Sequence, residues 1–420
     1  MIVGGIVQVP GDKSISHRAL ILTALAQGTS EIHHILQSAD IASTAHALRA
    51  LGAHIPPLSP WMSIEGGGRR SLTAPKSALD CGNSGTTARL MAGVAAGFDF
   101  STRFFGDASL TRRPMRRIAE PLTAMGATVT FDEGDHLPMT VQGGTLKPLS
   151  WVTEVSSAQV KSCVLIAGLV GGVPVVVREP VRSRDHTERM LHAMGVEVDR
   201  VGEVSRLEPI DHLEPLALHI PGDPSSAAFM AALAVLATEG AISIPHVCLN
   251  DTRTGFFRAL QRMGARIELH VDSQHGGEDV GAIFAWPSRL HGTDVGGAEA
   301  PSMIDELPLL ACVAARAEGT TVISGAAELR VKESDRIKAV VDNLRALGVT
   351  AEERPDGMVV TGSDKPLKGS VKTHGDHRIA MAFGVLGALP GSDIAIDDPG
   401  CVAVSYPGFW DDLRAAVTAS

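Results

Sequence analysis

Apolar positions along the chain predict two kinds of helix that alternate. The first kind is rich in Ala, Leu and Val around its whole circumference, starts near Ser, Thr or Asp, and closes at Gly. Such starts supply N-cap oxygens, and such a Gly accepts the left-handed conformation that follows a helix. Because a helix that is apolar on every side is buried, we predict six buried helices. They are residues 16–28, 86–97, 157–172, 225–240, 305–319 and 376–391.

A shorter amphipathic pattern, which ends in Gly and leads into an apolar segment, recurs between the buried helices. Its glycines are 74, 69, 69 and 84 residues apart, and those that close the buried helices are 69, 75, 68, 79 and 72 residues apart. Two interleaved series of similar period favour an internal repeat over the alternative, generic use of Gly to end helices. The five copies are residues 48–55, 122–129, 191–198, 260–267 and 344–351, and a sixth is expected at 409–417.

The repeats predict an α/β protein of six units of roughly 70 residues, each with two helices and several short strands. Residues 9–14 (VPGDKS) resemble residues 220–225 (IPGDPS), and each segment leads into a buried helix. We interpret the two segments as crossings between two domains, since 420 residues exceed one ordinary core. The predicted domains are residues 13–222 and residues 1–12 together with 223–420, with three units each.

Composition argues against several classes of protein. A net charge of −10 and an aromatic content of 4% do not fit a nucleic-acid-binding protein. The longest apolar run, residues 164–177, is interrupted by three Gly and one Pro, so we expect no membrane span. The five Cys lack CxxC spacing and no HExxH motif occurs, which favours a reducing, cytoplasmic location and no metal site. No targeting segment is expected at the N-terminus.

Charged residues gather where the buried helices begin. Helix N-termini bind small anions, and Arg binds carboxylate or phosphate through two parallel hydrogen bonds. The cations in or near these starts are Lys13, Arg18, Arg89, Arg112, Arg113, Lys161, Arg182, Arg184, Lys332, Arg336 and Arg378. This pattern predicts a site for a ligand with several negative charges. The alternative is a solvated surface with local ion pairs.

Two acidic residues lie among these cations and are candidate bases. Asp305 starts a buried helix, and Glu333 follows Lys332. A carboxylate beside cations stays ionised and can accept a proton. The alternatives are an N-cap role for Asp305 and an ion pair between Glu333 and Arg336 at i+3.

Eight motifs, in order, resemble the 5-enolpyruvylshikimate-3-phosphate synthase family, in its class II bacterial branch. They are VPGDKSISHRA, GNSGTTAR, GDASLTRRPM, SSAQVKS, SRDHTERM, APSMIDELP, RVKESDR and GDHRIAM, and the resemblance extends from residue 7 to about residue 410. It implies a two-lobed, inside-out α/β fold of six βαβαββ repeats with buried helices, and an active site in the cleft between the lobes. It also implies a monomer and no cofactor or metal.

The resemblance further implies a reaction and its residues. The enolpyruvyl group of phosphoenolpyruvate would pass to the 5-hydroxyl of shikimate 3-phosphate by addition and elimination, with Asp305, Glu333 and Lys13 catalytic. The implied shikimate 3-phosphate site is Lys13, Ser14, Arg18, Ser157, Ala158, Gln159, Arg184, Asp305 and Lys332. The implied phosphoenolpyruvate site is Lys13, Gly85, Arg113, Gln159, Arg336 and Arg378.

One position departs from the family pattern, and two other functions stay open. A Lys that reaches phosphoenolpyruvate in another branch is Val404 here, with Arg89 as a candidate replacement. Gly85 matches the form associated with glyphosate sensitivity, whereas Val404 obscures that assignment. A UDP-N-acetylglucosamine enolpyruvyl transferase is the nearest alternative, although its reactive Cys is missing from residues 106–114. A non-catalytic anion-binding scaffold is the second alternative.

Overall fold

The chain forms two compact units, and the computed structural model describes residues 1–418. Unit 1 contains Met1–Pro10, Pro221–Ser273 and the described chain from Asp279 on. Unit 2 contains Gly11–Ile220 and the short segment Gln274–Glu278. The sequence prediction placed its crossings after residues 12 and 222, and it did not separate residues 274–278 from their surroundings.

Three βαβαββ repeats are complete, and they share one strand order. The first is β4(Leu79–Asp80), α3(Gly85–Ala96), β5(Ser101–Phe105), α5(Arg116–Met125), β6(Thr128–Phe131) and β7(Met139–Gln142). The second is β8(Leu149–Val152), α6(Ala158–Gly171), β9(Val175–Arg178), α7(His186–Ala193), β10(Val198–Val201) and β11(Val204–Leu207). The third is β17(Asp294–Val295), α10(Leu307–Ala314), β18(Thr320–Ile323), α11(Arg336–Ala346), β19(Thr350–Arg354) and β20(Gly357–Thr361). In each, the first two strands pair in parallel and the other pairings are antiparallel.

The other three repeats are variations on this pattern. One is β12(Ala217–His219), α1(Lys13–Leu25), β2(Gln27–His33), α2(Ala39–Ala50) and β3(Trp61–Gly67). Another is α8(Pro224–Val235), β14(Ile242–Cys248), α9(Gly255–Arg262), β15(Arg266–His275) and β16(Glu278–Trp286). The last is β21(Lys368–Val371), α12(His377–Gly387), β22(Asp393–Ile396), α13(Phe409–Ala416) and β23(Val417–Thr418). The strand β12 pairs in parallel with β2, so the end of unit 2 completes its first repeat.

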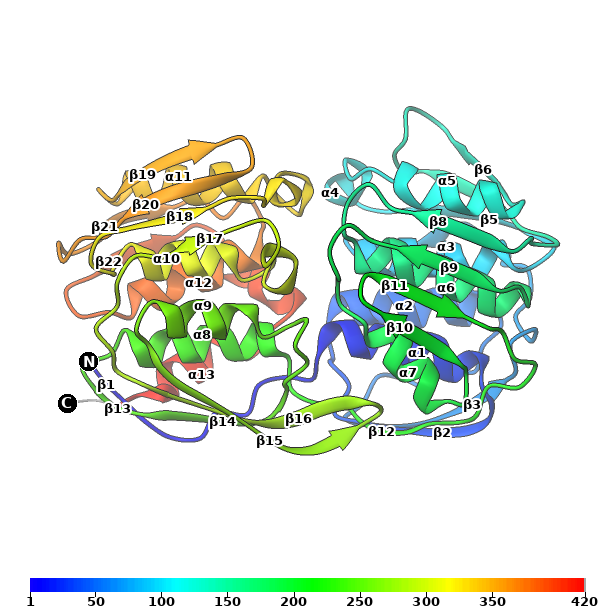
Figure 1. Cartoon of the computed structure of the whole chain (residues 1–420), viewed down its shortest axis with the longest axis horizontal. Coiled ribbons are helices and arrows are strands. Elements are labelled where there is room, and N and C mark those ends of the chain that lie inside the picture. Colours follow the sequence, from blue (N-terminus) through cyan, green and yellow to red (C-terminus); the bar gives the residue numbers. More distant parts are fainter. Residues whose placement is uncertain (419–420) are drawn as a thin grey trace. The chain divides into compact units, whose positions relative to one another are not determined.

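Helices form the interior of each unit, and the sheets lie outside them (Figure 1). In unit 2, α3 contacts α6 and α1. In unit 1, α12 contacts α10 and α8. All twelve residues of α8 are buried, as expected for a helix that is apolar on every side. The predicted α/β fold with buried helices is therefore confirmed.

The predicted ends of the buried helices need a correction. Gly172, directly after α6, is a left-handed C-cap with φ 69° as predicted, but Gly97 caps α3 in the right-handed region. The other closing glycines lie beyond the ends of their helices. Gly240, for example, lies in β13(Glu239–Gly240) with φ 100°, where a Cβ atom would come 1.7 Å from the Val3 carbonyl oxygen of β1(Ile2–Val3). This glycine permits close approach of two strands rather than capping a helix.

The glycines of the amphipathic series behave as predicted. Each follows its helix, α2, α5, α7, α9 or α11, with a positive φ between 80° and 110°. The left-handed region favours Gly because it has no Cβ, so these positions end the helices. The sixth amphipathic helix, α13, occupies the place expected from the repeat.

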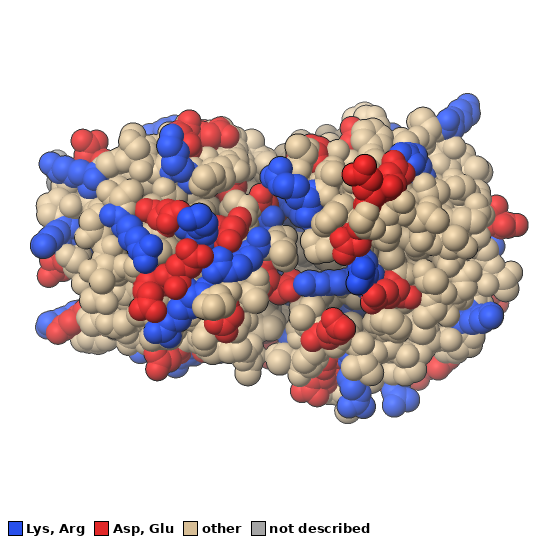
Figure 2. Space-filling model, turned by 90° about the horizontal axis from the view of Figure 1, so that it is seen from above, with Lys and Arg blue, Asp and Glu red and all other residues tan. Residues whose placement is uncertain are grey.

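No helix within residues 1–418 is long and apolar enough to cross a membrane. Figure 2 shows acidic and basic side chains intermixed on the face that it draws. A long basic stripe, which would suit a polyanion, is not visible on that face.

Candidate active site

The buried helices of unit 2 begin with side-chain caps. Asp12 accepts a hydrogen bond from the Ile15 N–H at 2.8 Å, and Ser84 accepts one from the Thr87 N–H at 3.1 Å. Ser157 caps α6 and is followed directly by Ala158. The capped ends leave other backbone N–H groups of each first turn to bind an anion.

Two predicted cations lie on α1, in different surroundings. The Lys13 ammonium contacts the Asp40 carboxylate of α2 at 2.6 Å. Arg18 is buried and donates to Thr187 Oγ1 at 2.7 Å, Ser162 Oγ at 2.8 Å and the Ser14 carbonyl oxygen at 2.9 Å. Arg18 therefore links α1 to α6 and α7.

The surroundings of Arg18 disfavour its charged form. Burial lowers the pKa of Arg18 to about 10, with Arg184 as an additional cationic cause, while Glu188 and Asp12 act in the opposite direction.

Gly85, Arg89 and Gln159 meet at the start of α3. Arg89 Nη1 donates to Gln159 Oε1 at 2.7 Å, and Gln159 Nε2 donates to Thr86 Oγ1 at 2.9 Å. A Cβ atom at Gly85 would lie 2.6 Å from Arg89 Nη1 and 3.4 Å from Arg113 Nη1. The absence of a side chain at Gly85 thus leaves room for two guanidinium groups.

Arg113 is the second of these guanidinium groups. It follows the short helix α4(Ala108–Thr111) and donates to Asn83 Oδ1 at 2.6 Å and Ser109 Oγ at 3.3 Å. Its side chain is buried, and the acceptors of these bonds are uncharged. The charge of Arg113 is therefore not neutralised by these two contacts.

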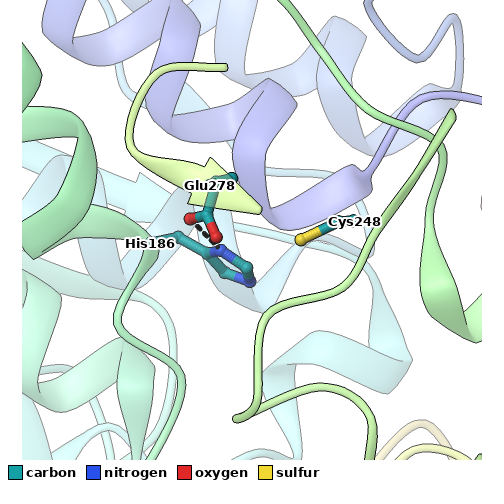
Figure 3. Close-up of side chains that lie close together, drawn as sticks. All are labelled: His186, Cys248 and Glu278. Atoms are coloured by element: carbon teal, nitrogen blue, oxygen red, sulfur yellow. Dashed lines mark hydrogen bonds and ion pairs between the residues drawn. The ribbon is translucent and has the colours of Figure 1, made fainter. Parts of the chain in front are cut away.

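The start of α7, next to Arg184, is supported by the segment Gln274–Glu278. Figure 3 shows His186 and Glu278, whose Nδ1 and Oε1 atoms are 2.7 Å apart and hydrogen-bonded. Cys248, drawn in the same view, is a residue of unit 1. Arg189 Nη1 also donates to the Gly277 carbonyl oxygen at 2.8 Å. We interpret the His186–Glu278 pair as a structural link between α7 and the segment Gln274–Glu278, because both side chains are buried.

In unit 1, Arg336 is the centre of the predicted site. It contacts Asp376 through Nε at 2.8 Å and through Nη2 at 3.2 Å. It also contacts Glu333 Oε2 at 2.8 Å and Asp305 Oδ1 at 3.1 Å. Burial alone would lower the pKa of Arg336, but Asp376, Glu333 and Asp305 outweigh burial and raise it.

Asp376 is fully buried and serves two purposes. It caps α12 by accepting the Arg378 N–H at 3.0 Å, and it accepts the Ser334 hydroxyl at 3.0 Å. Burial would raise the pKa of Asp376, but the Arg336 guanidinium prevails and holds that pKa below its usual range. Asp376 is thus an ionised anchor for Arg336.

The two remaining cations of unit 1 also face carboxylates. Lys332 Nζ lies 3.7 Å from Asp305 Oδ1. Arg378 Nη1 lies 3.6 Å from Glu306 Oε1, and Glu306 accepts a hydrogen bond from Ser225 of α8. Every predicted cation of unit 1 therefore has an acidic neighbour.

The structure bears on the alternatives to a catalytic role for the two candidate bases. Asp305 is not the N-cap of α10, because Glu306 holds that position and α10 begins at Leu307. Glu333 forms the i+3 ion pair with Arg336 that was the alternative to a catalytic role. An ion pair leaves the carboxylate ionised, so it does not exclude that role.

Arg89, which the sequence offered as a candidate replacement for the Lys missing at Val404, bonds to Gln159. Asp376 is a residue of this region that the sequence did not single out for a site role. Asp376 precedes the His-Arg of α12, and its role depends on Arg336, which is 40 residues away along the chain. Val404 lies in a 3-10 helix, Pro399–Val404.

The fold defines the class of protein. The enolpyruvyl transferase NikO from Streptomyces tendae is 17% identical and superposes with a TM-score of 0.76, covering 99% of this chain and 95% of that chain. At this identity the similarity shows the fold alone. The chain is therefore built on the fold of that enolpyruvyl transferase.

The family follows from closer relatives. The model of the EPSP synthase (3-phosphoshikimate 1-carboxyvinyltransferase) family matches residues 2–413. A 3-phosphoshikimate 1-carboxyvinyltransferase of Sulfurihydrogenibium is 47% identical over 98% of this chain and 96% of its own, and that of Caulobacter vibrioides is 46% identical over 98% and 95%. The EPSP synthase of Acinetobacter baumannii is 38% identical, with a TM-score of 0.86 over 99% of this chain and 96% of that chain. The chain belongs to the EPSP synthase family, as its motifs predicted.

Proposed function

We propose that this protein transfers the enolpyruvyl group of phosphoenolpyruvate to the 5-hydroxyl of shikimate 3-phosphate and releases phosphate. The observation that carries the proposal is the pair of carboxylates, Asp305 and Glu333, held on one buried arginine of a member of this family. Relatives that are 44–47% identical over nearly the whole chain carry the corresponding name.

Shikimate 3-phosphate would bind through residues of both units. The proposed contacts are Lys13, Ser14, Arg18, Ser157, Ala158, Gln159, Arg184, Asp305 and Lys332. The N-terminus of α6 suits a phosphate, because backbone N–H groups and a helix dipole point at it. The nearby Arg184 adds a charge-assisted hydrogen bond.

Phosphoenolpyruvate would bind through Lys13, Gly85, Arg113, Gln159, Arg336 and Arg378. The backbone at Gly85 and the guanidinium of Arg113 would receive its phosphate, since a guanidinium binds such a group through two hydrogen bonds. Arg89, beside Gly85, is a further candidate contact and takes the place of the Lys missing at Val404.

The proposed reaction has two stages, addition and elimination. In the first, Asp305 accepts the proton of the 5-hydroxyl as its oxygen attacks C2, and an acid among Glu333 and Lys13 protonates C3. In the second, the group that protonated C3, now a base, takes a proton back from C3 while the bond from C2 to the phosphate oxygen breaks, which restores the double bond and releases phosphate. Proton transfer of this kind contributes roughly 10²- to 10⁴-fold to a rate. The steps balance with side-chain acids and bases and require no redox partner.

The test is phosphate release from phosphoenolpyruvate with either shikimate 3-phosphate or UDP-N-acetylglucosamine as acceptor. Release with shikimate 3-phosphate alone supports the proposal. Release with UDP-N-acetylglucosamine alone would assign the alternative transferase, which the family match does not favour. Binding without release would assign an anion-binding scaffold. We further propose a monomer in the cytoplasm, which gel filtration with light scattering and cell fractionation would test.

A further inference from the structure

Glu179, a buried acidic residue of unit 2, adjoins the proposed phosphate site. Glu179 directly follows β9 and is 3% exposed. It touches two segments that the proposed function assigns to shikimate 3-phosphate, namely the start of α6 at Ser157 and the loop before Arg184. An acidic group so near a phosphate site is unfavourable unless its charge is neutralised and its position serves another purpose.

The carboxylate of Glu179 accepts hydrogen bonds from both segments. Oε1 accepts the Ser157 backbone N–H at 2.9 Å. Oε2 accepts the Ser183 backbone N–H at 3.3 Å, and the Ser183 hydroxyl donates to the carboxylate, 2.6 Å from Oε1 and 2.8 Å from Oε2. Because Ser183 precedes Arg184 directly, Glu179 fixes the distance between Ser157 and the backbone that carries Arg184.

Lys161 of α6 neutralises the charge of Glu179. Lys161 Nζ lies 2.8 Å from Glu179 Oε2 and 2.9 Å from Glu188 Oε1, and the Lys161 side chain is 2% exposed. Burial would lower the pKa of Lys161, but Glu188 and Glu179 prevail and raise it. Ser205 Oγ donates to Glu188 at 2.9 Å. Lys161 therefore stays charged and holds Glu179 in place.

We propose that Glu179 is a positioning residue for the 3-phosphate of the acceptor substrate. It sets Ser157 and the Ser183–Arg184 backbone at the separation that a phosphate group spans, and it makes no contact with substrate itself. This proposal rests on the proposed function, because it takes Ser157 and Arg184 as phosphate contacts.

Replacing Glu179 by Gln tests this role with little change in shape. A carboxylate offers acceptors at both ends, whereas an amide offers an acceptor at one end and a donor at the other. If the amide oxygen faces Ser157, its NH₂ group meets the Ser183 N–H and Lys161. If it faces Ser183, the NH₂ group meets the Ser157 N–H. Either orientation leaves one backbone N–H without its acceptor.

The matched control is Glu188→Gln, which removes the other carboxylate from Lys161. Glu188 bonds to Ser205 and Lys161, and these bonds do not include Ser157 or Ser183. We expect Glu179→Gln to raise the Kd and KM for shikimate 3-phosphate by about tenfold or more, with kcat within threefold and KM for phosphoenolpyruvate unchanged. Glu188→Gln should lose comparable stability to urea but raise the KM for shikimate 3-phosphate much less than Glu179→Gln does.

The measurements are calorimetric titration with shikimate 3-phosphate, steady-state kinetics and urea unfolding of the wild type and both variants. Equal Kd values for Glu179→Gln and wild type, or equal losses in the two variants, would overturn the positioning role. A wild-type protein that does not bind shikimate 3-phosphate would instead overturn the proposed function, and this inference with it. If Glu179→Gln does not fold, Ser183→Ala removes the hydroxyl bond alone, and an unchanged Kd in that variant also contradicts the proposal.

Discussion

Three arginines of unit 2 that belong to or adjoin the proposed site differ from Arg336 of unit 1 in the partners of their hydrogen bonds. In unit 2, Arg18, Arg89 and Arg113 donate to hydroxyl, amide and carbonyl oxygens, which carry no charge. In unit 1, Arg336 donates to the carboxylates of Asp376, Glu333 and Asp305. At these hydrogen bonds, a phosphate in unit 2 would compete with uncharged acceptors, whereas at Arg336 it competes with carboxylates that are already bound.

This difference suggests a division of labour in the proposed reaction. The uncharged partners of Arg18, Arg89 and Arg113 would oppose the attraction of these cations for a phosphate less than carboxylate partners would. At Arg336, an anion that binds must take over hydrogen bonds from Glu333 or Asp305. Release of a carboxylate from a guanidinium makes it a stronger base, so binding there would prepare the proton transfers. Asp376 would stay in place as the buried anchor.

The largest expected effect is the loss of turnover in Glu333→Gln and Asp305→Asn. Each change keeps the shape but removes a group able to accept a proton, so kcat should fall by about 10²- to 10⁴-fold. Binding of shikimate 3-phosphate should persist, since the cations of unit 2 are untouched. An assay of phosphate release would measure kcat, and calorimetric titration would measure the binding of shikimate 3-phosphate. Asp342→Asn, in the exposed pair with Lys338, is the control, and near-normal kcat in either site variant would remove that residue from the mechanism.

The next effect is on stability, and it compares Arg336→Met with Arg113→Met. Removing Arg336 leaves Asp376 buried without its cation, so the free energy of unfolding should fall by about 3–5 kcal/mol. Removing Arg113 breaks bonds to the uncharged Asn83 and Ser109 and should cost about 1–3 kcal/mol. Urea unfolding of both variants would measure the difference. Equal losses would mean that the partners of the two arginines do not differ in energetic importance.

A smaller effect is expected for Gly85→Ala in unit 2. The new methyl group would lie 2.6 Å from Arg89 Nη1 and must displace that guanidinium. We expect KM for phosphoenolpyruvate to rise by about tenfold, or about 1.4 kcal/mol, with a smaller change in kcat. Gly144→Ala is the control, because a Cβ atom there has no neighbour within 4 Å. An unchanged KM would show that Arg89 moves aside without consequence for binding.

The smallest effect concerns pH, which should affect the two units in different ranges. Burial, followed by Lys13 and Arg18, holds the pKa of His17 in unit 2 well below its ordinary value near 6.5. The unfolded chain then binds a proton below about pH 6.5 that the folded chain does not, so stability falls as pH decreases. Asp376 in unit 1 has a lowered pKa, so its contribution is complete above about pH 4 and is lost below it.

Urea unfolding between pH 8 and 3 would separate the two contributions. His17→Asn should flatten the loss of stability just below pH 6.5, where one proton contributes at most about 1.4 kcal/mol per pH unit. Asp376→Asn should change the dependence below about pH 4 and leave the upper range unaltered. An unchanged slope below pH 6.5 in His17→Asn would assign the acid sensitivity there to other groups.

The sequence by itself determined the elements of this protein and the types of residue in its site. The period of the helices, the left-handed glycines at Gly52, Gly126, Gly195, Gly264 and Gly348, and the α/β class could all be read from local patterns. They could be read because helix amphipathicity and a positive φ are properties of a few neighbouring residues. The eight motifs identified the family for a similar reason, since each is a short, contiguous segment.

Only the tertiary structure decided which side chains form ion pairs and hydrogen bonds with one another. Arg336 and Asp376 are 40 residues apart, Glu179 and Ser157 are 22 apart, and the segment Gln274–Glu278 joins a unit whose other residues end at Ile220. Such pairings depend on how repeats stack and where strands approach, and no local pattern encodes them. For the same reason, Gly240 read as a helix cap in the sequence but permits contact between strands in the fold. The partners of each arginine are therefore set by packing.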